Sequence, residues 1–215
     1  MLVGHLARRI RVVVFDLDGT LTEVDSLWRY LHDAFGTWDR GQVAAERYRN
    51  GEISYKEWAE ADAKDWAGCS MVEVNRVVEG IRYRAGAKDV FHELRRRGVK
   101  IVILSAGLSI LAEKAARDLG ADLAVANELR VDDGRLTGEI EVKVGVDSKK
   151  GLVKEIASGF GVPLREVALV GDRGFDLANP ECLKIAFMPK DDVARFEAHH
   201  VIEAADLRVI LQYLM

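Results

Sequence analysis

The sequence predicts an α/β protein with a doubly wound parallel sheet and a small group of helices inserted after the first strand. Two observations predict the sheet: five short segments are almost continuously apolar, and amphipathic helical patterns lie between most of them. Strands that helices cover on both faces have this apolar character. An alternation of strand and helix is typical of parallel sheets that bind ligands at the carboxyl ends of their strands.

The expected strands are rich in Val, Ile and Leu, and they occupy residues 10–15, 100–105, 121–126, 166–171 and 183–188. The helical patterns occupy residues 87–97, 109–119, 149–159 and 206–213. His199 and His200 are expected to end a helix near the C-terminus, with no third ligand for a metal. A hairpin is predicted over residues 129–144, because Asp133-Gly134 is a turn signal between two strand-like segments.

Residues 26–83 interrupt the alternation. They show helix-like stretches broken at Gly36, Gly51 and Gly68, no convincing strand, and all four tryptophans of the chain. We therefore predict a helical cap of residues 25–83, which lies over the carboxyl edge of the sheet and has the tryptophans in a small core of its own. The α/β core is then formed by residues 1–24 and 84–215.

Composition and charge exclude several classes of function. The 215 residues carry a formal net charge of -4, which predicts no basic surface for nucleic acid or for an anionic membrane. No apolar stretch approaches the roughly 18 residues that span a bilayer. The N-terminal stretch MLVGHLARRIRVVVF lacks a small-residue cleavage site, so a secretory signal is not expected. Cys69 and Cys182 are far apart, and so few thiols indicate a reducing, cytoplasmic location.

Polar residues gather at the ends of the predicted strands. Strand 10–15 is followed by Asp16, Asp18, Gly19 and Thr20, strand 100–105 ends in Ser105-Ala106-Gly107, helix 149–159 begins with Lys149-Lys150-Gly151, and strand 166–171 is followed by Asp172 and Asp176. Because ligands bind where parallel strands end, we expect these groups to surround one site.

The chemistry of this set indicates a divalent metal and a phosphoryl group. Carboxylates packed together repel one another unless a cation joins them, and Mg²⁺ takes oxygen ligands from one or two carboxylates, waters and phosphate. A lysine and a serine nearby supply charge and a hydrogen bond to phosphoryl oxygens. Gly19 and Gly107 allow backbone N–H groups to approach the same phosphate.

Three other interpretations of the motifs fail. Asp16 and Asp18 have the first spacing of a calcium loop, but Leu21 stands where that loop needs glycine and Leu27 where it needs glutamate. The glycine spacings of dinucleotide-binding and P-loop proteins are absent. A role in capping a turn would account for one aspartate but not for the whole set.

Taken in order, these stretches resemble the four motifs of the haloacid dehalogenase superfamily of phosphohydrolases. The stretches are DLDGT, Ser105, Lys150 and GDRGFD, and the match covers nearly the whole chain. Within the superfamily the chain is most similar to phosphoserine phosphatases, on LSAGL, the DDGRLTGEI hairpin and KKGLVKEIASGFGVPLREVALVGD. The resemblance implies the superfamily's Rossmann-like core with a helical cap after the first strand.

The resemblance also implies a role for each site residue. Asp16 would be the nucleophile that forms an aspartyl-phosphate, and Asp18 would protonate the leaving oxygen and then activate water. Phosphate oxygens would be held by Thr20, Ser105 and the backbone at Ala106 and Gly107, and Lys150 would neutralise charge, although Lys149 is also possible. The Mg²⁺ ligands would be Asp16, Asp172 and the Asp18 carbonyl, with Asp176 ordering a metal-bound water or the loop.

The chain departs from the phosphoserine phosphatase pattern at the phosphate motif. GDRGFD replaces the family's GDGAND, so Phe175 stands in place of an asparagine and Arg173 is new. Arg173 either replaces the lost phosphate contact or is a surface residue.

Two further departures concern the substrate. Asp25 replaces a family glutamate that meets the substrate ammonium. Asp62 falls where the family has an arginine for the substrate carboxylate, unless a shift in register brings Lys56 or Lys64 there.

The sequence therefore predicts a Mg²⁺-dependent phosphomonoesterase for a small phosphorylated metabolite, with phosphoserine as the leading candidate. Three alternatives remain: a phosphatase for another small ester, a phosphotransferase or mutase, and a receiver-type phosphorylated switch. A mutase needs a second phosphate site, and no basic cluster in the cap supplies one. A base such as Asp18, two residues from the nucleophile, hastens hydrolysis where a switch needs persistence.

Overall fold

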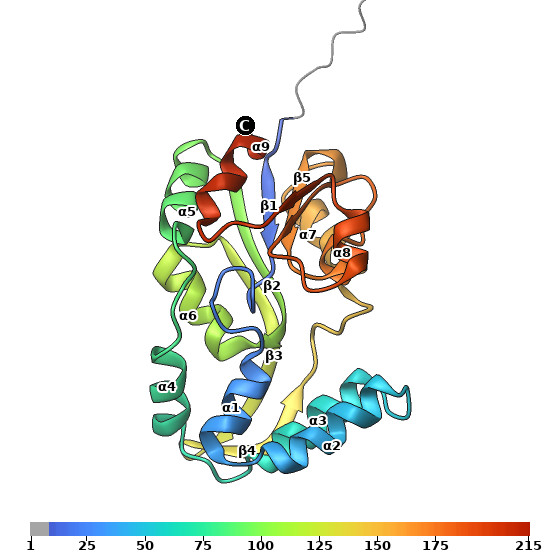
Figure 1. Cartoon of the computed structure of the whole chain (residues 1–215). Helices are drawn as coiled ribbons and strands as arrows, with labels where there is room; N and C mark the ends of the chain where they lie inside the picture. Colours follow the sequence, from blue (N-terminus) through green and yellow to red (C-terminus); the bar gives the residue numbers. More distant parts are fainter. Residues whose placement is uncertain (1–8) are drawn as a thin grey trace, which may run out of the picture.

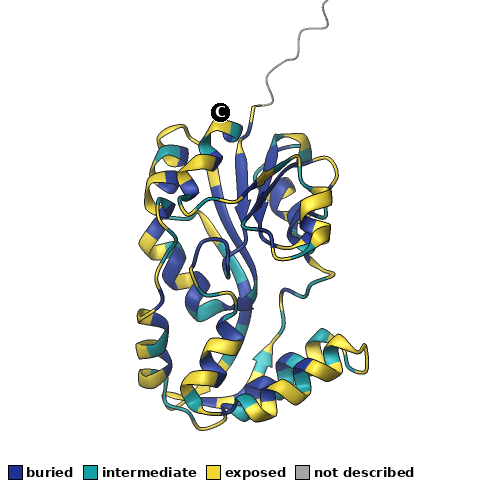
Figure 2. Cartoon of the chain, viewed as in Figure 1, coloured by how far each residue is buried: buried dark blue, intermediate teal, exposed yellow. Residues whose placement is uncertain are grey.

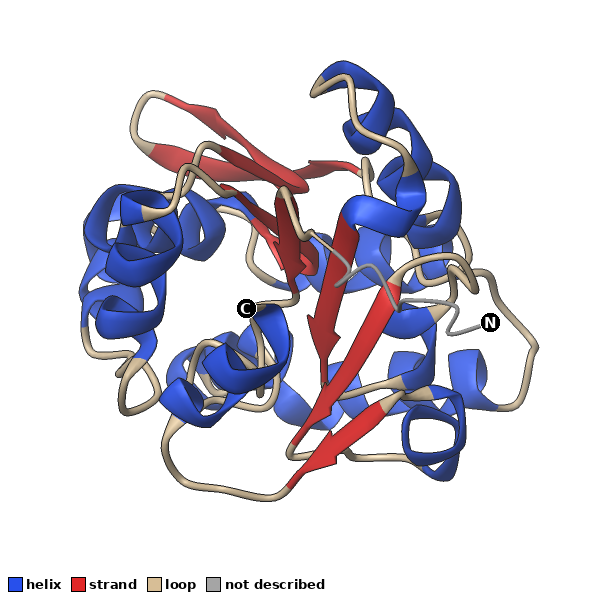
Figure 3. Ribbon diagram, turned by 90° about the horizontal axis from the view of Figure 1, so that it is seen from above, coloured by secondary structure: helices blue, strands red, loops and turns tan. Residues whose placement is uncertain are grey.

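A computed structural model describes residues 9–215 and has the predicted architecture, with helices on both faces of a seven-stranded sheet over that range (Figures 1 and 3). The strand order is β4-β3-β2-β1-β5-β6-β7, and only β4 is antiparallel to its neighbour. The strands are β1 (Val12–Phe15), β2 (Lys100–Leu108), β3 (Leu123–Asp132), β4 (Arg135–Glu141), β5 (Val167–Gly171), β6 (Leu183–Phe187) and β7 (His200–Ile202).

The sequence prediction for the C-terminal region was wrong at one point. His200 begins the short edge strand β7, which pairs in parallel with β6, instead of ending a helix. Three residues are too few to show a periodic pattern, and the Nδ1 atom of His199 accepts a hydrogen bond from the Lys184 amide. The strand therefore forms through its pairing with β6.

The helices are α1 (Leu27–Phe35), α2 (Trp38–Arg49), α3 (Tyr55–Asp65), α4 (Met71–Glu79), α5 (Ala87–Arg96), α6 (Ser109–Leu119), α7 (Lys149–Gly159), α8 (Asp192–Glu197) and α9 (Leu211–Leu214). Short 3₁₀ helices occupy Leu164–Glu166, Gly174–Leu177 and Leu207–Ile210.

The central strands are buried on both faces because alternate side chains enter two separate apolar clusters (Figure 2). Val13 and Phe15 of β1 join the cluster that includes residues of α5 and α6. Val12 and Val14 join the cluster that includes residues of α7 and α8. Successive strand residues point to opposite faces, so a strand covered on both sides must be apolar throughout.

Helices α1 to α4 follow β1 and extend past the carboxyl edge of the sheet (Figure 1). Ser26 caps α1, and Ser54 with Glu57 forms a capping box that starts α3. The buried cluster of the sheet continues into these helices and includes Leu31 and Trp66. The division into a core of 1–24 and 84–215 and a cap of 25–83 stays a prediction.

The β3–β4 hairpin turns at Asp133-Gly134, as predicted, and both turn residues have positive φ angles. It joins the inserted helices by backbone hydrogen bonds from Gly68 to Leu136 and from Met71 to Gly134, of 2.8 and 2.9 Å. Helices α1–α4 are therefore connected to the sheet both through the chain after β1 and through these hydrogen bonds to the hairpin.

Within residues 9–215, no helix has the length and apolar content required to cross a membrane. The prediction that the N-terminus is not a secretory signal rests largely on residues 1–8, which lie outside the described residues.

Candidate active site

The candidate site lies where the direction of the sheet's connections reverses. From β1 the chain builds outward to β2 and β3 on one side, and later to β5 and β6 on the other. Asp16 and Asp18 directly follow β1, and Asp172 follows its neighbour β5. A reversal of this kind leaves a crevice at the carboxyl ends of the strands, where ligands bind.

Three buried carboxylates meet in this crevice. Asp16, Asp172 and Asp176 each offer an oxygen within 4.8 Å of the others. Burial raises the pKa of Asp172 and of Asp176, and the charge of Asp16 raises both further. Asp172 and Asp176 therefore favour their neutral forms until a cation reduces the repulsion.

Lys149 supplies one such cation. Its Nζ atom donates to Asp16 at 2.7 Å and to Asp176 at 2.5 Å, and it lies 5.2 Å from the centre of the Phe175 ring. Burial opposes the charged form of Lys149, but Asp16 and Asp176 outweigh it and raise its pKa. Lys149 is thus held as a cation beside Asp16.

The structure corrects the predicted lysine, because Lys150 is exposed and Lys149 occupies the site. Lys149 lies four and seven residues before Val153 and Ile156, which are buried on the inner face of α7. Residues at these spacings share one helix face. The apolar pattern of α7 was therefore the sequence signal that would have selected Lys149.

Asp18, two residues after Asp16, is partly buried and is oriented by the cap. Its Oδ2 accepts a hydrogen bond of 2.8 Å from the Leu27 amide, the first residue of α1. Burial raises the pKa of Asp18 to about 7, and the charge of Asp16 acts in the same direction. Within the described residues, Asp18 Oδ1 and Thr20 Oγ1 are buried without a hydrogen-bond partner. Buried polar atoms are normally paired, so both atoms suit a polar ligand.

Gly19 allows the loop after β1 to pass close to Asp172. Its φ is +79°, and a methyl group built on it would lie 2.5 Å from Asp172 Oδ2. A side chain at this position would therefore displace one carboxylate of the cluster.

The Ser105-Ala106-Gly107 segment near the end of β2 is held by three side chains that the sequence did not single out. The Gly107 amide donates to Ser105 Oγ at 2.9 Å. The Ala106 carbonyl accepts from Trp28 Nε1 at 3.2 Å, from Asn127 Nδ2 at 2.9 Å and from the Tyr55 hydroxyl. Trp28 and Tyr55 belong to α1 and α3, so the cap donates hydrogen bonds directly to this part of β2.

Asn127 connects five polar groups, since it also donates to Val144 and Tyr55 and accepts from the Lys143 and Val144 amides. Asn127→Ala is expected to lower the free energy of unfolding by about 3 kcal/mol, because buried backbone groups lose their partners. Urea denaturation measures this. Asn50→Ala, at an exposed asparagine, is the control and should change stability by less than about 0.5 kcal/mol. Equal effects of the two variants would contradict the prediction.

Of the residues expected to select the substrate, Asp25 and Arg173 lie at the rim of the crevice and Asp62 is buried elsewhere. Asp25 lies at the rim, 3.0 Å from the Lys190 ammonium. Arg173 is exposed, and its amide donates to Asp176. Asp62 is buried in the cap, where its Oδ1 lies 3.2 Å from Nε2 of the buried His32.

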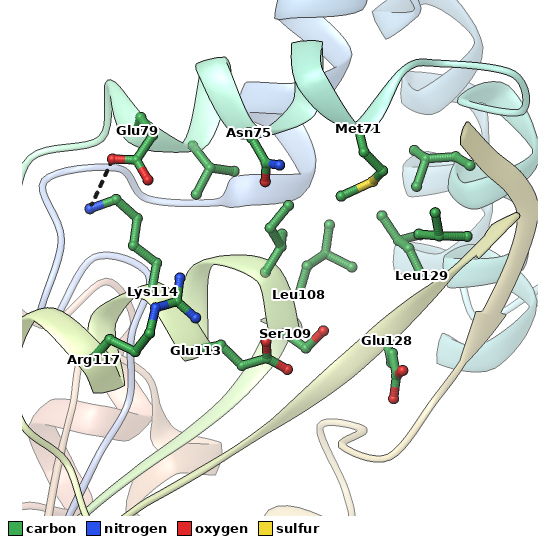
Figure 4. Close-up of a pocket in the computed structure, with 14 residues that line it drawn as sticks. Met71, Asn75, Glu79, Leu108, Ser109, Glu113, Lys114, Arg117, Glu128 and Leu129 are labelled. Carbon is green, nitrogen blue, oxygen red and sulfur yellow. Dashed lines mark ion pairs between the residues drawn. The ribbon is translucent and has the colours of Figure 1, made fainter. Parts of the chain in front are cut away.

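A separate pocket of about 290 Å³ lies between α4, α6 and the β3–β4 hairpin (Figure 4). Met71, Leu108 and Leu129 line its apolar part, and Glu79 faces Lys114 at one end, 3.8 Å away. Neither Asp16 nor any other carboxylate of the cluster lines this pocket. It is distinct from the crevice described above.

Comparison with known proteins agrees with this geometry. Residues 13–178 match the haloacid dehalogenase-like hydrolase family. The chain belongs to this family. The match includes β1, β2, β5 and the residues that they deliver to the crevice.

Among similar relatives of this haloacid dehalogenase-like hydrolase is a phosphoserine phosphatase of Archaeoglobus fulgidus, 33% identical over 86% of this chain and 54% of the relative. One from Methanocaldococcus jannaschii is 28% identical over 97% of this chain and its own full length. A solved structure of a substrate-bound phosphoserine phosphatase complex superposes with a TM-score of 0.83 at 26% identity, covering 96% of this chain and 99% of the other. The structure of a phospho-aspartyl intermediate analogue of phosphoserine phosphatase superposes with a TM-score of 0.83 at 27% identity. The superposition covers 96% of this chain and 100% of the other.

The donor set of this hydrolase fits a divalent metal ion. Asp16, Asp172 and Asp176 offer only oxygen ligands, which hard cations prefer. Burial, and then the charges of Asp16 and Asp176, raise the pKa of Asp172, and a bound cation would offset both effects. Asp172 and Asp16 would hold such an ion, while Lys149 bonds the side of the cluster toward Asp176.

Proposed function

We propose that the chain is a Mg²⁺-dependent phosphomonoesterase that hydrolyses phosphoserine through an aspartyl-phosphate on Asp16. One observation carries this proposal: Asp16, paired with Lys149, lies beside a partly buried Asp18, which has a raised pKa and an Oδ1 atom without a hydrogen-bond partner among the described residues. A nucleophile and a proton carrier two residues apart are what a two-step hydrolysis requires.

In the first step, Asp16 attacks phosphorus, and the bond between phosphorus and the serine oxygen breaks. Asp18 donates its proton to that oxygen, which leaves as the serine hydroxyl. In the second step, Asp18 accepts a proton from water as the water oxygen attacks phosphorus. The bond between phosphorus and Asp16 breaks, which restores the Asp16 carboxylate and releases inorganic phosphate. The pKa of about 7 lets Asp18 serve in both directions near neutral pH.

Other residues stabilise the charge on the phosphoryl group. Thr20 Oγ1 and Ser105 Oγ are placed to donate to its oxygens, and Lys149 supplies a positive charge at Asp16. Bound Mg²⁺ would add charge neutralisation at Asp16 and Asp172. Arg173, exposed at the rim, is a further candidate for contact with phosphate.

Phosphoserine is favoured as the substrate by two kinds of support. Relatives in both comparisons carry the name phosphoserine phosphatase, one of them in a substrate complex. Asp25 places a carboxylate at the rim of the crevice, where an ammonium group can bind. We also infer a cytoplasmic location, since neither Cys69 nor Cys182 forms a disulfide bond.

Steady-state kinetics on phosphoserine and 4-nitrophenyl phosphate test the proposal. We expect a kcat/KM for phosphoserine at least about 100-fold higher, because contacts to the amino acid add to those of the phosphate. Equal values would reject phosphoserine as the substrate and keep the phosphatase class. Absence of phosphate release from every ester would reject both.

Mg²⁺ should stabilise the protein more strongly at high pH. Burial raises the pKa of Asp172 and Asp176, so the metal-free folded state binds more protons than the unfolded state, and its stability falls as pH rises above the ordinary aspartate pKa of 3.8. Bound Mg²⁺ favours the ionised carboxylates and opposes this loss. At a 100-fold excess over its Kd, the ion should add about 2.7 kcal/mol.

Thermal unfolding with Mg²⁺ or with EDTA, at about pH 5 and about pH 8, measures this effect through linkage. The Tm increase should be larger at the higher pH and should vanish in Asp172→Asn. An increase that is the same at both pH values, or that survives in Asp172→Asn, would contradict a site at this cluster.

A further inference from the structure

Lys190 lies at the rim of the crevice, although no motif of the sequence points to it. It follows the end of β6 by three residues, after Met188, which has a positive φ of 50°. The Lys190 amide donates to the Asp172 carbonyl at 2.7 Å. A non-glycine residue in this backbone region is uncommon and is often found near functional sites. The backbone of Lys190 is thus held beside the acidic cluster.

The Lys190 ammonium forms an ion pair with Asp25 from the start of the cap, with Nζ and Oδ1 3.0 Å apart. The Asp25 side chain is 62% exposed and that of Lys190 is 35% exposed. Ion pairs that are this accessible to water contribute little to stability. A ligand that offers both a cation and an anion can therefore replace the pair at small cost.

Asp25 lies near the loop that follows β1, and its partner Lys190 lies there with it. A methyl group built on Gly19 would lie 2.5 Å from Asp172 Oδ2 and 3.6 Å from Asp25 Oδ1, so these carboxylates approach the same piece of backbone. The Gly19 amide also donates to the Val24 carbonyl at 2.7 Å, which ties the residue before Asp25 to this loop.

The cations of α3 and Arg84 are exposed or engaged with other groups. Lys56 is exposed and lies 3.8 Å from Glu60, and Lys64 is exposed. The Arg84 guanidinium donates to the carbonyls of Gly19, Thr20 and Thr22. Asp62, at the position where a substrate carboxylate would need a cation, is buried against His32.

We propose that Lys190 binds the α-carboxylate of the substrate while Asp25 binds its ammonium, the two exchanging their mutual ion pair for a zwitterionic amino acid phosphate. This inference rests on the proposed function and assigns the carboxylate contact to the core of the protein. A lysine is a single point charge and makes no bidentate contact, so the contribution is moderate.

Three esters separate the two contacts: phosphoserine, phosphoethanolamine, which lacks the carboxylate, and 4-nitrophenyl phosphate, which lacks both groups. Lys190→Met should lower kcat/KM for phosphoserine by about 10- to 100-fold, mainly through KM, and change the other two by less than about 3-fold. Asp25→Asn should lower the values for both ammonium-bearing esters. Lys190→Arg should retain most of the preference for phosphoserine.

Lys100→Met is the matched control, since it removes a lysine from a partly exposed Lys–Asp pair at the amino end of β2 and should leave all three esters unaffected. A Lys190→Met variant that loses activity equally on the three esters, or on none, overturns the assignment. If the unaltered protein does not prefer phosphoserine to 4-nitrophenyl phosphate, the proposed function fails and this inference fails with it.

Discussion

Asp16→Asn should reduce the rate of phosphate release by at least about 10⁴-fold, which is typical for loss of a covalent nucleophile. The amide is nearly the same size as the carboxylate. Its oxygen can still accept a hydrogen bond from Lys149, whose Nζ lies 2.7 Å from Asp16 Oδ1 in the unaltered protein. It cannot form the acyl phosphate bond, however. The large effect is therefore expected without a collapse of the surrounding structure.

Single-turnover kinetics and trapping of a phosphoenzyme analogue measure this loss directly. Both signals should disappear in Asp16→Asn, while the circular dichroism spectrum stays unchanged. Asp122→Asn is the control, because it removes a carboxylate that accepts a hydrogen bond from Ile101 at the amino end of β2. This variant should keep the turnover of the unaltered protein. Turnover like that of the unaltered protein in Asp16→Asn would exclude Asp16 as the nucleophile.

Lys149→Met should lower kcat by about 10³-fold, because the transferred phosphoryl group loses a preorganised positive charge. It should also reduce stability in the metal-free protein by about 3–5 kcal/mol, the range for leaving buried charges without their partner. The Lys149 side chain is 3% exposed and pairs with both Asp16 and Asp176. Its loss therefore leaves two carboxylates without their cation at a position that bulk water does not reach.

Lys150→Met makes the matched comparison, since the two lysines are adjacent and only Lys149 is buried. Lys150→Met should change kcat by less than about 3-fold and stability by less than about 0.5 kcal/mol. Measurements of kcat and of urea denaturation for both variants decide the matter. A larger loss in Lys150→Met would show that the lysine predicted from the sequence was the right one.

The sequence predicted the features that depend on local pattern. The apolar runs located the five longer parallel-sheet strands, since strands covered on both faces need side chains such as Val12 to Phe15 throughout. The aspartates after β1 and β5 were placed in one crevice because parallel strands deliver their carboxyl ends to the same edge.

The tertiary structure decided the features that depend on distant partners. Lys149 and Lys150 differ by about 100° around α7, and only packing against the sheet turned Lys149 inward. Asn127, Tyr55 and Trp28 are far apart in the sequence, yet they converge on the Ala106 carbonyl.

The positions of the charged groups that we propose to select the substrate were also decided by the fold. Asp62 lies 3.2 Å from His32 inside the cap, and Asp25 pairs with Lys190 at the rim. The sequence by itself determined the reaction class, because Asp16 and Asp18, the proposed nucleophile and proton carrier, lie two residues apart at the end of one strand. The proposed substrate contacts required the tertiary structure, because an ion pair depends on distance in space, and Asp25 and Lys190 are 165 residues apart in the sequence.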